Sequence, residues 1–131
     1  MKFILIDQLV ECGPTRAVAL KNVSASEEYL ADHFPSFPVL PGVFMLEAMI
    51  QAARAVLEER GLRQMMLGEV RALRYGSFVR PGESLRVEVD LVKEGDDQYA
   101  FKGNGLRVRP GSAEEADTAV SGRFTMRAAA P

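Results

Sequence analysis

The second half of the chain alternates between apolar and polar residues, as strands with one buried face do. Turns that contain glycine or proline separate four such runs, at residues 65–76, 84–94, 97–108 and 117–128. The alternation is clearest from Leu85 to Leu91. Near the N-terminus, two shorter runs at 4–12 and 15–23 flank Gly13-Pro14, which predicts a β-hairpin. We therefore predict a hairpin that is followed, later in the chain, by four antiparallel strands.

A different pattern in the middle of the chain predicts one long helix at residues 43–60. Its first three turns are apolar on nearly every face, which is typical of a buried helix. Gly61 is a suitable C-terminal stop. The preceding residues 34–42 contain three prolines, which fix φ and lack an N–H, so we expect a stiff, extended loop there. Before this loop, serines followed by acidic residues predict a short helical turn near 26–31.

A helix that is apolar on nearly every face can be buried only if the sheet curls around it. The sequence thus predicts an α+β architecture in which a curved antiparallel sheet wraps one long buried helix, and this is the hot-dog fold. The chain has 131 residues, with no internal repeat and no low-complexity linker. We therefore expect residues 1–131 to form a single domain.

Composition excludes several classes of function. The chain has 16 basic and 18 acidic residues, and a net charge of −2 gives no overall attraction to nucleic acids or anionic membranes. No run of about 18 uncharged apolar residues occurs, so no membrane-spanning helix is expected. Asp7 interrupts the apolar N-terminal run too early for a secretory signal, and we expect a cytoplasmic protein. The single cysteine, Cys12, and the single histidine exclude an intramolecular disulfide and sites that need two imidazoles from one chain.

Two polar residues are candidates for chemistry. His33 adjoins the proline-rich loop, whose rigidity favours preorganisation, and an imidazole titrates near neutral pH, as a general base requires. Glu47 lies one turn into the apolar helix, where a buried carboxyl group kept in its protonated form could donate a proton. Gln51 follows at i+4 and can hydrogen-bond to it. Each candidate also has a purely structural interpretation: a surface or core histidine, and an acid that the helix dipole favours.

The start of the helix is a third candidate. Backbone N–H groups in the first turn of a helix have no intrahelical partner and carry positive potential. Gly42 has no side chain, so a ligand could approach these groups closely. The junction is either a simple loop-to-helix connection or an oxyanion-type donor for a polarised carbonyl.

Residues 33–51 carry a motif, His33-Phe34-Pro35-x-x-Pro38-Val39-x-Pro41-Gly42-Val43-x-x-x-Glu47-Ala48-x-x-Gln51. In these positions the chain resembles the active-site signature of the 3-hydroxyacyl-[acyl-carrier-protein] dehydratases of FabZ type. Three further segments also resemble that family: Phe3-Ile4-Leu5-Ile6-Asp7, Lys21-Asn22-Val23-Ser24 and Val79-x-Pro81-Gly82-Glu83. The likeness covers about residues 3–90, in the same order.

The resemblance implies a hot-dog protein that works as a dimer or a trimer of dimers, with an active site shared between subunits. It implies that a (3R)-3-hydroxyacyl chain on the phosphopantetheine of acyl carrier protein loses water to give the trans-2-enoyl thioester. Carried over, His33 takes the C2 proton, and Glu47 from the neighbouring subunit protonates the departing C3 hydroxyl. The Gly42 N–H would bind the thioester carbonyl, and Gln51 would orient Glu47. The resemblance implies no metal and no organic cofactor.

The acyl chain of such a substrate needs an apolar slot. Its candidate walls, each of which could equally be plain core, are Phe37, Phe44, Met45, Met49 and Phe78. Ser36, Phe37 and Gly76-Ser77-Phe78 depart from the residues that are usual in the family. These departures indicate a different acyl substrate, as in secondary lipid or polyketide-type biosynthesis.

A basic segment could recognise the carrier protein. Between residues 60 and 80 there is one acid, Glu69, and five arginines: Arg60, Arg63, Arg71, Arg74 and Arg80. A patch of this charge would steer an acidic carrier protein, although ordinary solvated strand charge explains it equally well. Arginines without interleaved aromatic residues do not predict nucleic-acid binding.

Two alternative functions remain open. A hot-dog acyl thioesterase shares the fold and uses a carboxylate to activate water, but it does not need the loop that carries His33. A non-catalytic acyl-binding paralogue would gain nothing from a buried carboxylate at Glu47. Release of free thiol would identify the thioesterase, and a tightly bound acyl ligand without turnover would identify the paralogue.

Overall fold

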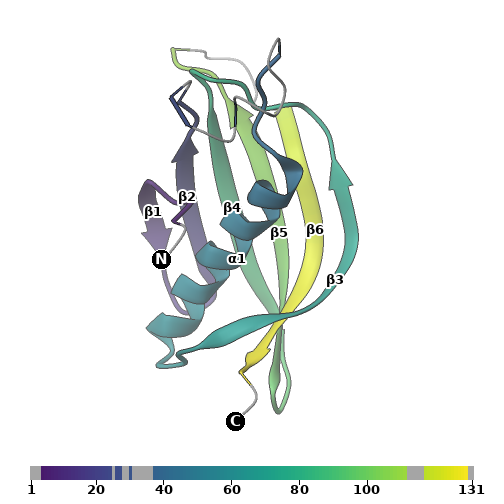
Figure 1. Cartoon of the computed structure of the whole chain (residues 1–131). Helices are drawn as coiled ribbons and strands as arrows, with labels where there is room; N and C mark the ends of the chain where they lie inside the picture. The colour runs from purple at the N-terminus through teal and green to yellow at the C-terminus, as the bar shows by residue number, and fades with distance from the viewer. Residues whose placement is uncertain (1–3, 25, 28–29, 31–36, 112–116, 130–131) are drawn as a thin grey trace.

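The structure is a computed structural model, and it describes residues 4–24, 26–27, 30, 37–111 and 117–129. Within these residues, six strands form one antiparallel sheet in the order β1-β2-β4-β5-β6-β3. The strands are β1 (Gln8–Cys12), β2 (Arg16–Asn22), β3 (Met65–Tyr75), β4 (Ser84–Glu94), β5 (Gln98–Val108) and β6 (Asp117–Ala128). The helix α1 (Gly42–Glu59) lies against the concave face of the sheet (Figure 1). The hairpin, the helix and the four later strands are thus confirmed.

The helix packs closely on the sheet because small residues face each other across the interface. Ala48, Ala52 and Ala53 are fully buried on the side of α1 that faces the sheet. On β5, a Cβ atom at Gly103 would lie only 2.7 Å from the Met49 sulfur, so a larger residue there would push the helix away. Beside this contact, the rings of Phe101 and Phe124 stack with their centroids 5.6 Å apart. The core therefore lies between α1 and the concave face of the sheet, and β2 and β4 also contribute fully buried residues such as Ala19 and Val87.

The expectation that α1 is buried on nearly every face is wrong for a single chain. Its buried residues occupy one side: Met45, Ala48, Met49, Ile50, Ala52, Ala53, Val56 and Leu57. On the other side, Val43 is 67% exposed and Glu47 is only partly covered. The sheet curls around one side of the helix only, so apolar residues on the opposite side remain in contact with solvent.

The first strand begins later than predicted, at Gln8 rather than at residue 4. Asp7 makes the first bond to the next strand, from its N–H to the Leu20 carbonyl at 2.8 Å. Residues 4–6 instead form a strap beside α1, and Leu5 is buried in the core. A side chain of the helix satisfies the Leu5 N–H, which therefore needs no strand partner.

Two further expectations fall partly on residues that the structure does not describe. The helical turn near 26–31 is described only at Ser26, Glu27 and Leu30, where the Leu30 N–H donates to the Glu27 carbonyl at 3.1 Å. The extended loop expected at 34–42 is described only from Phe37 onwards. In the described part of the chain, no helix is long and apolar enough to cross a membrane.

Candidate active site

The candidate site centres on the first turn of α1. No side chain caps this helix, and the buried Pro41 directly precedes Gly42. The Leu40 N–H donates to the Val79 carbonyl at 2.8 Å, which ties the entry of the helix to the segment between β3 and β4. Among the described residues, the N–H groups of Gly42 and Val43 find no acceptor. They are therefore available to a ligand, at the positive end of the helix dipole.

An apolar pocket of about 370 Å³ opens beside this turn. Its walls come from the loop before α1, from the first turn of α1 and from the end of β3, and they include Val39, Leu40, Gly42, Val43, Met45, Tyr75, Phe78 and Ala119. Two of the predicted apolar walls, Met45 and Phe78, line the pocket. The pocket thus joins the free N–H groups to a surface that can hold an acyl chain.

The other predicted walls lie elsewhere. Phe44 is half-buried against the core, because a residue two positions after Gly42 points to another side of a helix. Met49 contacts Gly103 in the core. Phe37 packs edge-on against Phe78, with ring centroids 6.0 Å apart, and so borders the pocket only through that residue.

Tyr75, at the end of β3, is a residue of the site that the sequence did not suggest. A Cβ atom at Gly42 would lie 2.8 Å from two carbons of the Tyr75 ring. The tyrosine ring therefore occupies the space that the glycine leaves open. Partial burial raises the pKa of the Tyr75 hydroxyl, which stays protonated and able to donate a hydrogen bond at neutral pH. The contact joins positions 33 residues apart, so no local pattern could have revealed it.

Glu47 lies one turn further along α1, with 37% of its side chain exposed. The predicted burial of this carboxyl group is therefore wrong for the single chain, because Glu47 is on the side of α1 away from the sheet. Its Oε1 atom accepts a hydrogen bond from Gln51 Nε2 at 3.4 Å and lies 3.5 Å from Arg54 Nη1. Within the described part of the chain, Oε2 has no partner. One oxygen of the carboxyl group is held, and the other is free.

Arg54 was missed in the sequence, although its position gave a signal. It lies seven residues after Glu47 and three after Gln51, which places all three on one side of the helix. Its Nε atom donates to the Met65 carbonyl at 3.1 Å, at the start of β3. The arginine is therefore tied to the sheet and contacts Glu47 from a fixed position.

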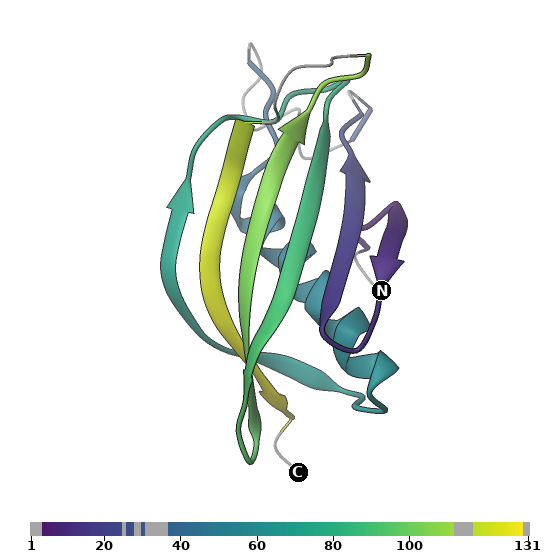
Figure 2. The ribbon, with the colours of Figure 1, turned by 180° about the vertical axis from the view of Figure 1, so that it is seen from behind.

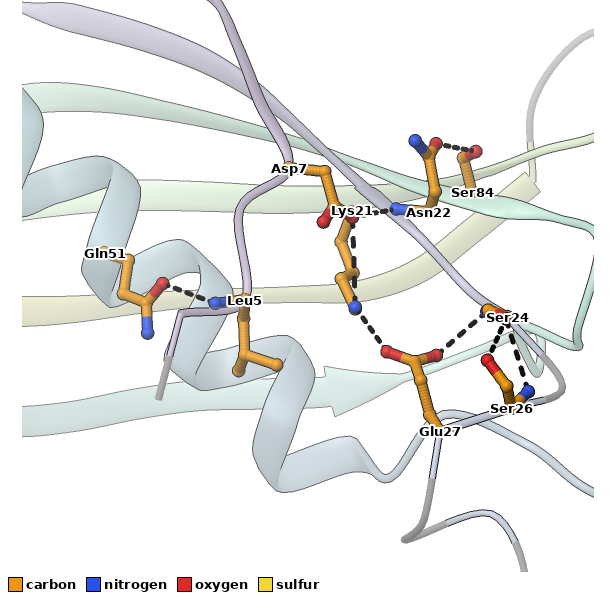
Figure 3. A network of polar contacts seen from close by, with 9 residues as sticks. All are labelled: Leu5, Asp7, Lys21, Asn22, Ser24, Ser26, Glu27, Gln51 and Ser84. Atoms are coloured by element: carbon orange, nitrogen blue, oxygen red, sulfur yellow. Dashed lines mark hydrogen bonds and ion pairs between the residues drawn. The ribbon is translucent and has the colours of Figure 1, made fainter. Parts of the chain in front are cut away.

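Gln51 connects Glu47 to the N-terminal strap, and Figure 3 shows its contact with Leu5 of that strap. The Leu5 N–H donates to Gln51 Oε1 at 2.9 Å, while Gln51 Nε2 donates to Glu47. These two contacts determine which end of the amide faces Glu47. The predicted hydrogen bond between Gln51 and Glu47 is therefore present.

A second polar network in Figure 3 surrounds Lys21. This lysine is 8% exposed, and its ammonium group pairs with the carboxylate of Glu27 and lies 3.8 Å from Asp7. Each carboxylate also accepts a backbone bond: Asp7 from the Asn22 N–H at 2.7 Å, and Glu27 from the Ser24 N–H at 2.9 Å. A buried cation thus joins the strap, β2 and the turn that precedes the motif of residues 33–51.

The candidate base, His33, lies outside the described residues, as do Asp32, Phe34, Pro35 and Ser36. The chain is fixed shortly before that segment, where Leu30 is 3% exposed in the core. Within the described residues, no group of three or more histidine, cysteine, aspartate or glutamate side chains could hold a metal ion.

The basic segment of residues 60–80 does not form one patch. Arg60 pairs with Glu94 near the C-terminal end of α1. Arg80 lies over the ring of Phe37, 4.4 Å from its centroid, beyond the far end of β3. The 11 residues of β3 span roughly 35 Å, which separates the two ends of the segment.

Comparison with known proteins agrees with the motif. Two proteins named 3-hydroxyacyl-[acyl-carrier-protein] dehydratase FabZ, from Geobacillus thermodenitrificans and Bacillus cytotoxicus, are 40% and 44% identical to this chain over 95 residues. Each alignment covers 70% of this chain and 66% of the relative. The matched part is thus slightly less than two thirds of the length of these relatives.

A solved structure shares the fold. The dehydratase heterocomplex ApeI:P from Xenorhabdus doucetiae matches with a TM-score of 0.72 at 21% identity, over 97% of this chain and 84% of that chain. This likeness confirms the hot-dog fold. A family model described as "ApeI-like: ApeI dehydratase" matches residues 10–112, a range that contains every candidate site residue named above except Leu5, Asp7 and Ala119. This chain therefore belongs to the ApeI-like dehydratase family.

Proposed function

We propose that this chain is a cytoplasmic hydro-lyase. It removes water from (3R)-3-hydroxyacyl thioesters on acyl carrier protein and yields trans-2-enoyl thioesters, in fatty-acid biosynthesis or in a related lipid or polyketide pathway. The names of the similar proteins support this activity. The observation that carries the proposal is the setting of Glu47: one carboxyl oxygen is held and the other is free, one turn from an uncapped helix N-terminus and its apolar pocket.

Each chemical step has a candidate group. The reaction needs a base for the proton on C2, an acid for the hydroxyl on C3, and a donor for the thioester carbonyl. We assign the base to His33, the acid to Glu47 and the donor to the Gly42 N–H. Gln51 is then a positioning residue, because it holds Glu47 Oε1 and leaves Oε2 to carry the transferable proton.

The proton balance closes over one turnover. The C2–H bond breaks, and its proton passes to the imidazole of His33. The electron pair left on C2 forms the C2=C3 double bond as the C3–O bond breaks. The departing oxygen takes a proton from Glu47 and leaves as water. The site then returns to its initial state when His33 loses a proton and Glu47 gains one.

The substrate chain would lie in the pocket beside Gly42. Phe78 forms part of the wall, and Phe37 supports it through their edge-on contact. Phe44, at the start of α1, is a further candidate wall in an assembly of several chains. An apolar wall of this kind binds an acyl chain through burial of its methylene groups, each worth about 0.8 kcal/mol.

We propose that the chain works as a homodimer or a trimer of dimers, with sites shared between subunits. A depression of about 1340 Å³ runs along the side of α1 away from the sheet, and Glu47, Gln51 and Arg54 line it. Ile4, also in its lining, is 67% exposed. β3 lies at one end of the strand order and leaves an edge for another chain. A second copy on this side would cover Glu47 and supply the His33 of the other subunit.

Sedimentation velocity of the purified chain at micromolar concentration tests this assembly. Sedimentation as a dimer or hexamer is the expected result. A monomer at all concentrations would contradict the homodimer. That result would instead indicate that this chain assembles with a different partner chain, as the relative from Xenorhabdus does in its heterocomplex.

The activity itself is tested with the wild-type protein and crotonyl and longer 2-enoyl thioesters, on pantetheine and on carrier protein. We expect hydration of the double bond, seen as loss of the enoyl absorbance, without release of free thiol. Release of free thiol would identify a thioesterase instead. A tightly bound acyl ligand without turnover on any chain length would identify a non-catalytic acyl-binding protein.

Gly42→Ala is expected to lower the hydration rate, since the new methyl group would overlap the Tyr75 ring at 2.8 Å and force that ring to move. Tyr75 is 52% exposed and can swing outwards, so the loss of stability should stay below about 1.5 kcal/mol. The double variant Gly42→Ala/Tyr75→Ala removes the overlap. If the double variant recovers the wild-type rate, the displaced Tyr75 ring caused the loss. If its rate stays as low as that of Gly42→Ala, the methyl group acts at the Gly42 N–H instead. Unaltered kinetics in Gly42→Ala would show that the close contact between Gly42 and the Tyr75 ring is not needed for turnover.

A further inference from the structure

The face of the sheet that points away from α1 carries a concentration of positive charge. Figure 2 views this face, with the helix behind the strands. Along β5 and β6, exposed Lys102 and Arg123 alternate with buried residues of the core, so their side chains point outwards. The exposed basic residues of β5, β6, β3 and the end of β4 form what we call the outer basic face: Arg71, Arg74, Lys93, Lys102, Arg123 and Arg127.

Three of these cations form a row across neighbouring strands. Lys102 on β5 lies directly opposite Arg123 on β6, and Arg123 lies directly opposite Arg71 on β3. Directly opposite residues share a face of the sheet with their Cβ atoms about 5 Å apart, and like charges in such pairs destabilise the sheet. A ligand that brings negative charge to this row would relieve the repulsion.

The chain itself supplies little negative charge to this face. Glu69 pairs with Arg71 at 3.1 Å. Asp90 lies opposite Lys102, but both of its oxygens accept bonds from Arg16 at 2.9 Å. Among the described residues, the other five cations of the outer basic face form no ion pair. The face is thus strongly positive in a chain whose net charge is −2.

The outer basic face also contains a hollow. It measures about 410 Å³, and the cations Arg71, Lys93 and Arg123 lie around it. Glu69, Ala100 and Thr125 also line it, whereas the rings of Phe101 and Phe124 face the core and are almost fully buried. The hollow can therefore seat a protruding element with carboxylates, but its described lining exposes no aromatic ring on which a nucleic-acid base could stack.

We propose that the outer basic face is the docking surface for the acyl carrier protein; the identity of this partner rests on the proposed function. Carrier proteins are typically acidic, so the charges are complementary. The face also reaches the candidate site. Arg74 is the residue before Tyr75, whose ring covers Gly42, and Arg71 lies four residues from Tyr75, or roughly 13 Å along the strand. A carrier protein that docks on this face therefore lies next to the entrance of the apolar pocket.

The test reverses one charge in the middle of the row. Arg123→Glu places a carboxylate between Lys102 and Arg71, so the variant should fold at least as well as the wild type. We expect its affinity for a fluorescently labelled bacterial acyl carrier protein, measured by anisotropy, to fall by about tenfold at low salt. Arg86→Glu is the matched control. Arg86 is also exposed on the outer side of the sheet, but it is on β4, where Glu88 already pairs with it at 3.2 Å.

Kinetics separate docking from chemistry. With a substrate on carrier protein, Arg123→Glu should raise KM by about the same tenfold factor. With the same acyl group on pantetheine alone, kcat and KM should remain as in the wild type. An equal effect of Arg86→Glu, no loss of affinity in Arg123→Glu, or no binding of carrier protein by the wild type would each overturn the proposal. So would tighter binding of an RNA oligonucleotide than of the carrier protein.

The two proposals can fail separately. If the wild type binds carrier protein through Arg123 but hydrates no enoyl thioester, docking stands and the hydro-lyase assignment falls. If the wild type hydrates carrier-linked substrates and Arg123→Glu leaves both affinity and KM unchanged, the activity stands and the docking surface is wrong.

Discussion

Glu47→Gln is expected to lower kcat for the hydration of 2-enoyl thioesters by at least about 100-fold, with the fold intact. Glutamine keeps the size and the hydrogen-bonding capacity of the side chain, so Gln51 and Arg54 retain a partner at this position. In hydration it cannot take the proton from water as the C3–O bond forms, which is the reverse of the step assigned to Glu47 in dehydration. The measurement is the change in enoyl absorbance with time, at saturating substrate, together with circular dichroism of both proteins.

Glu58→Gln is the matched control for this experiment. Glu58 lies on the same helix and lines the same depression along α1, but three turns from Glu47. The same charge is removed there without touching the candidate site, so kcat should change by less than about twofold. Equal losses in both variants would show that the helix charge matters rather than the acid, and Glu47 would lose its assigned role.

His33→Ala should lose at least about as much activity as Glu47→Gln, because hydration needs the imidazole to give a proton to C2 while Glu47 takes one from water. Two groups that act in one step give non-additive effects, and the double variant should be scarcely slower than either single variant. A double variant whose loss equals the product of the two single losses would mean that they act in separate steps.

The second large effect concerns stability. Lys21→Met should lower the free energy of unfolding by about 3 kcal/mol, because it leaves carboxylates near a buried position without their cation. Lys21 is 8% exposed, and the side chain of its partner Glu27 is 19% exposed, so water replaces the lost ion pair poorly. Urea denaturation, followed by circular dichroism, measures the change.

Two variants interpret the result. In Lys21→Met/Glu27→Gln the unpaired charge is gone, and we expect part of the lost stability to return. Arg71→Met removes a cation from an ion pair with Glu69 in which the two side chains are 73% and 61% exposed, so stability should scarcely change. If Lys21→Met were no more harmful than Arg71→Met, the buried network would contribute nothing to stability.

The outcomes for the fold show where sequence patterns are reliable. The alternation of apolar and polar residues placed the four later strands within one residue at each end, because a half-buried strand has no other way to hide its apolar side. The apolar helix was found for a similar reason. The pattern did not predict which side of the helix is buried: Val43 and Glu47 face away from the sheet. An apolar sequence indicates that a residue avoids water, but it does not indicate which chain covers that residue.

The candidate site divides in the same way. Local spacing was sufficient for the contact between Gln51 and Glu47, because residues four apart adjoin on any helix. It was insufficient for the contact between Tyr75 and Gly42, which depends on how β3 lies against the start of α1. Phe44 and Met49 were proposed as pocket walls for their apolar character alone. Their positions on the helix instead place them against the core.

The sequence by itself determined the fold class, the extent of the helix and later strands, the family, and the motif from His33 to Gln51, all of which depend on the order and periodicity of neighbouring residues. Only the tertiary structure decided which charges lie together. It scattered the arginines of residues 60–80, which are close in sequence, and brought Arg71 beside Arg123 and Lys102. The physical reason is the register of the antiparallel strands, because it joins distant residues across the sheet while each extended strand carries its own neighbours apart.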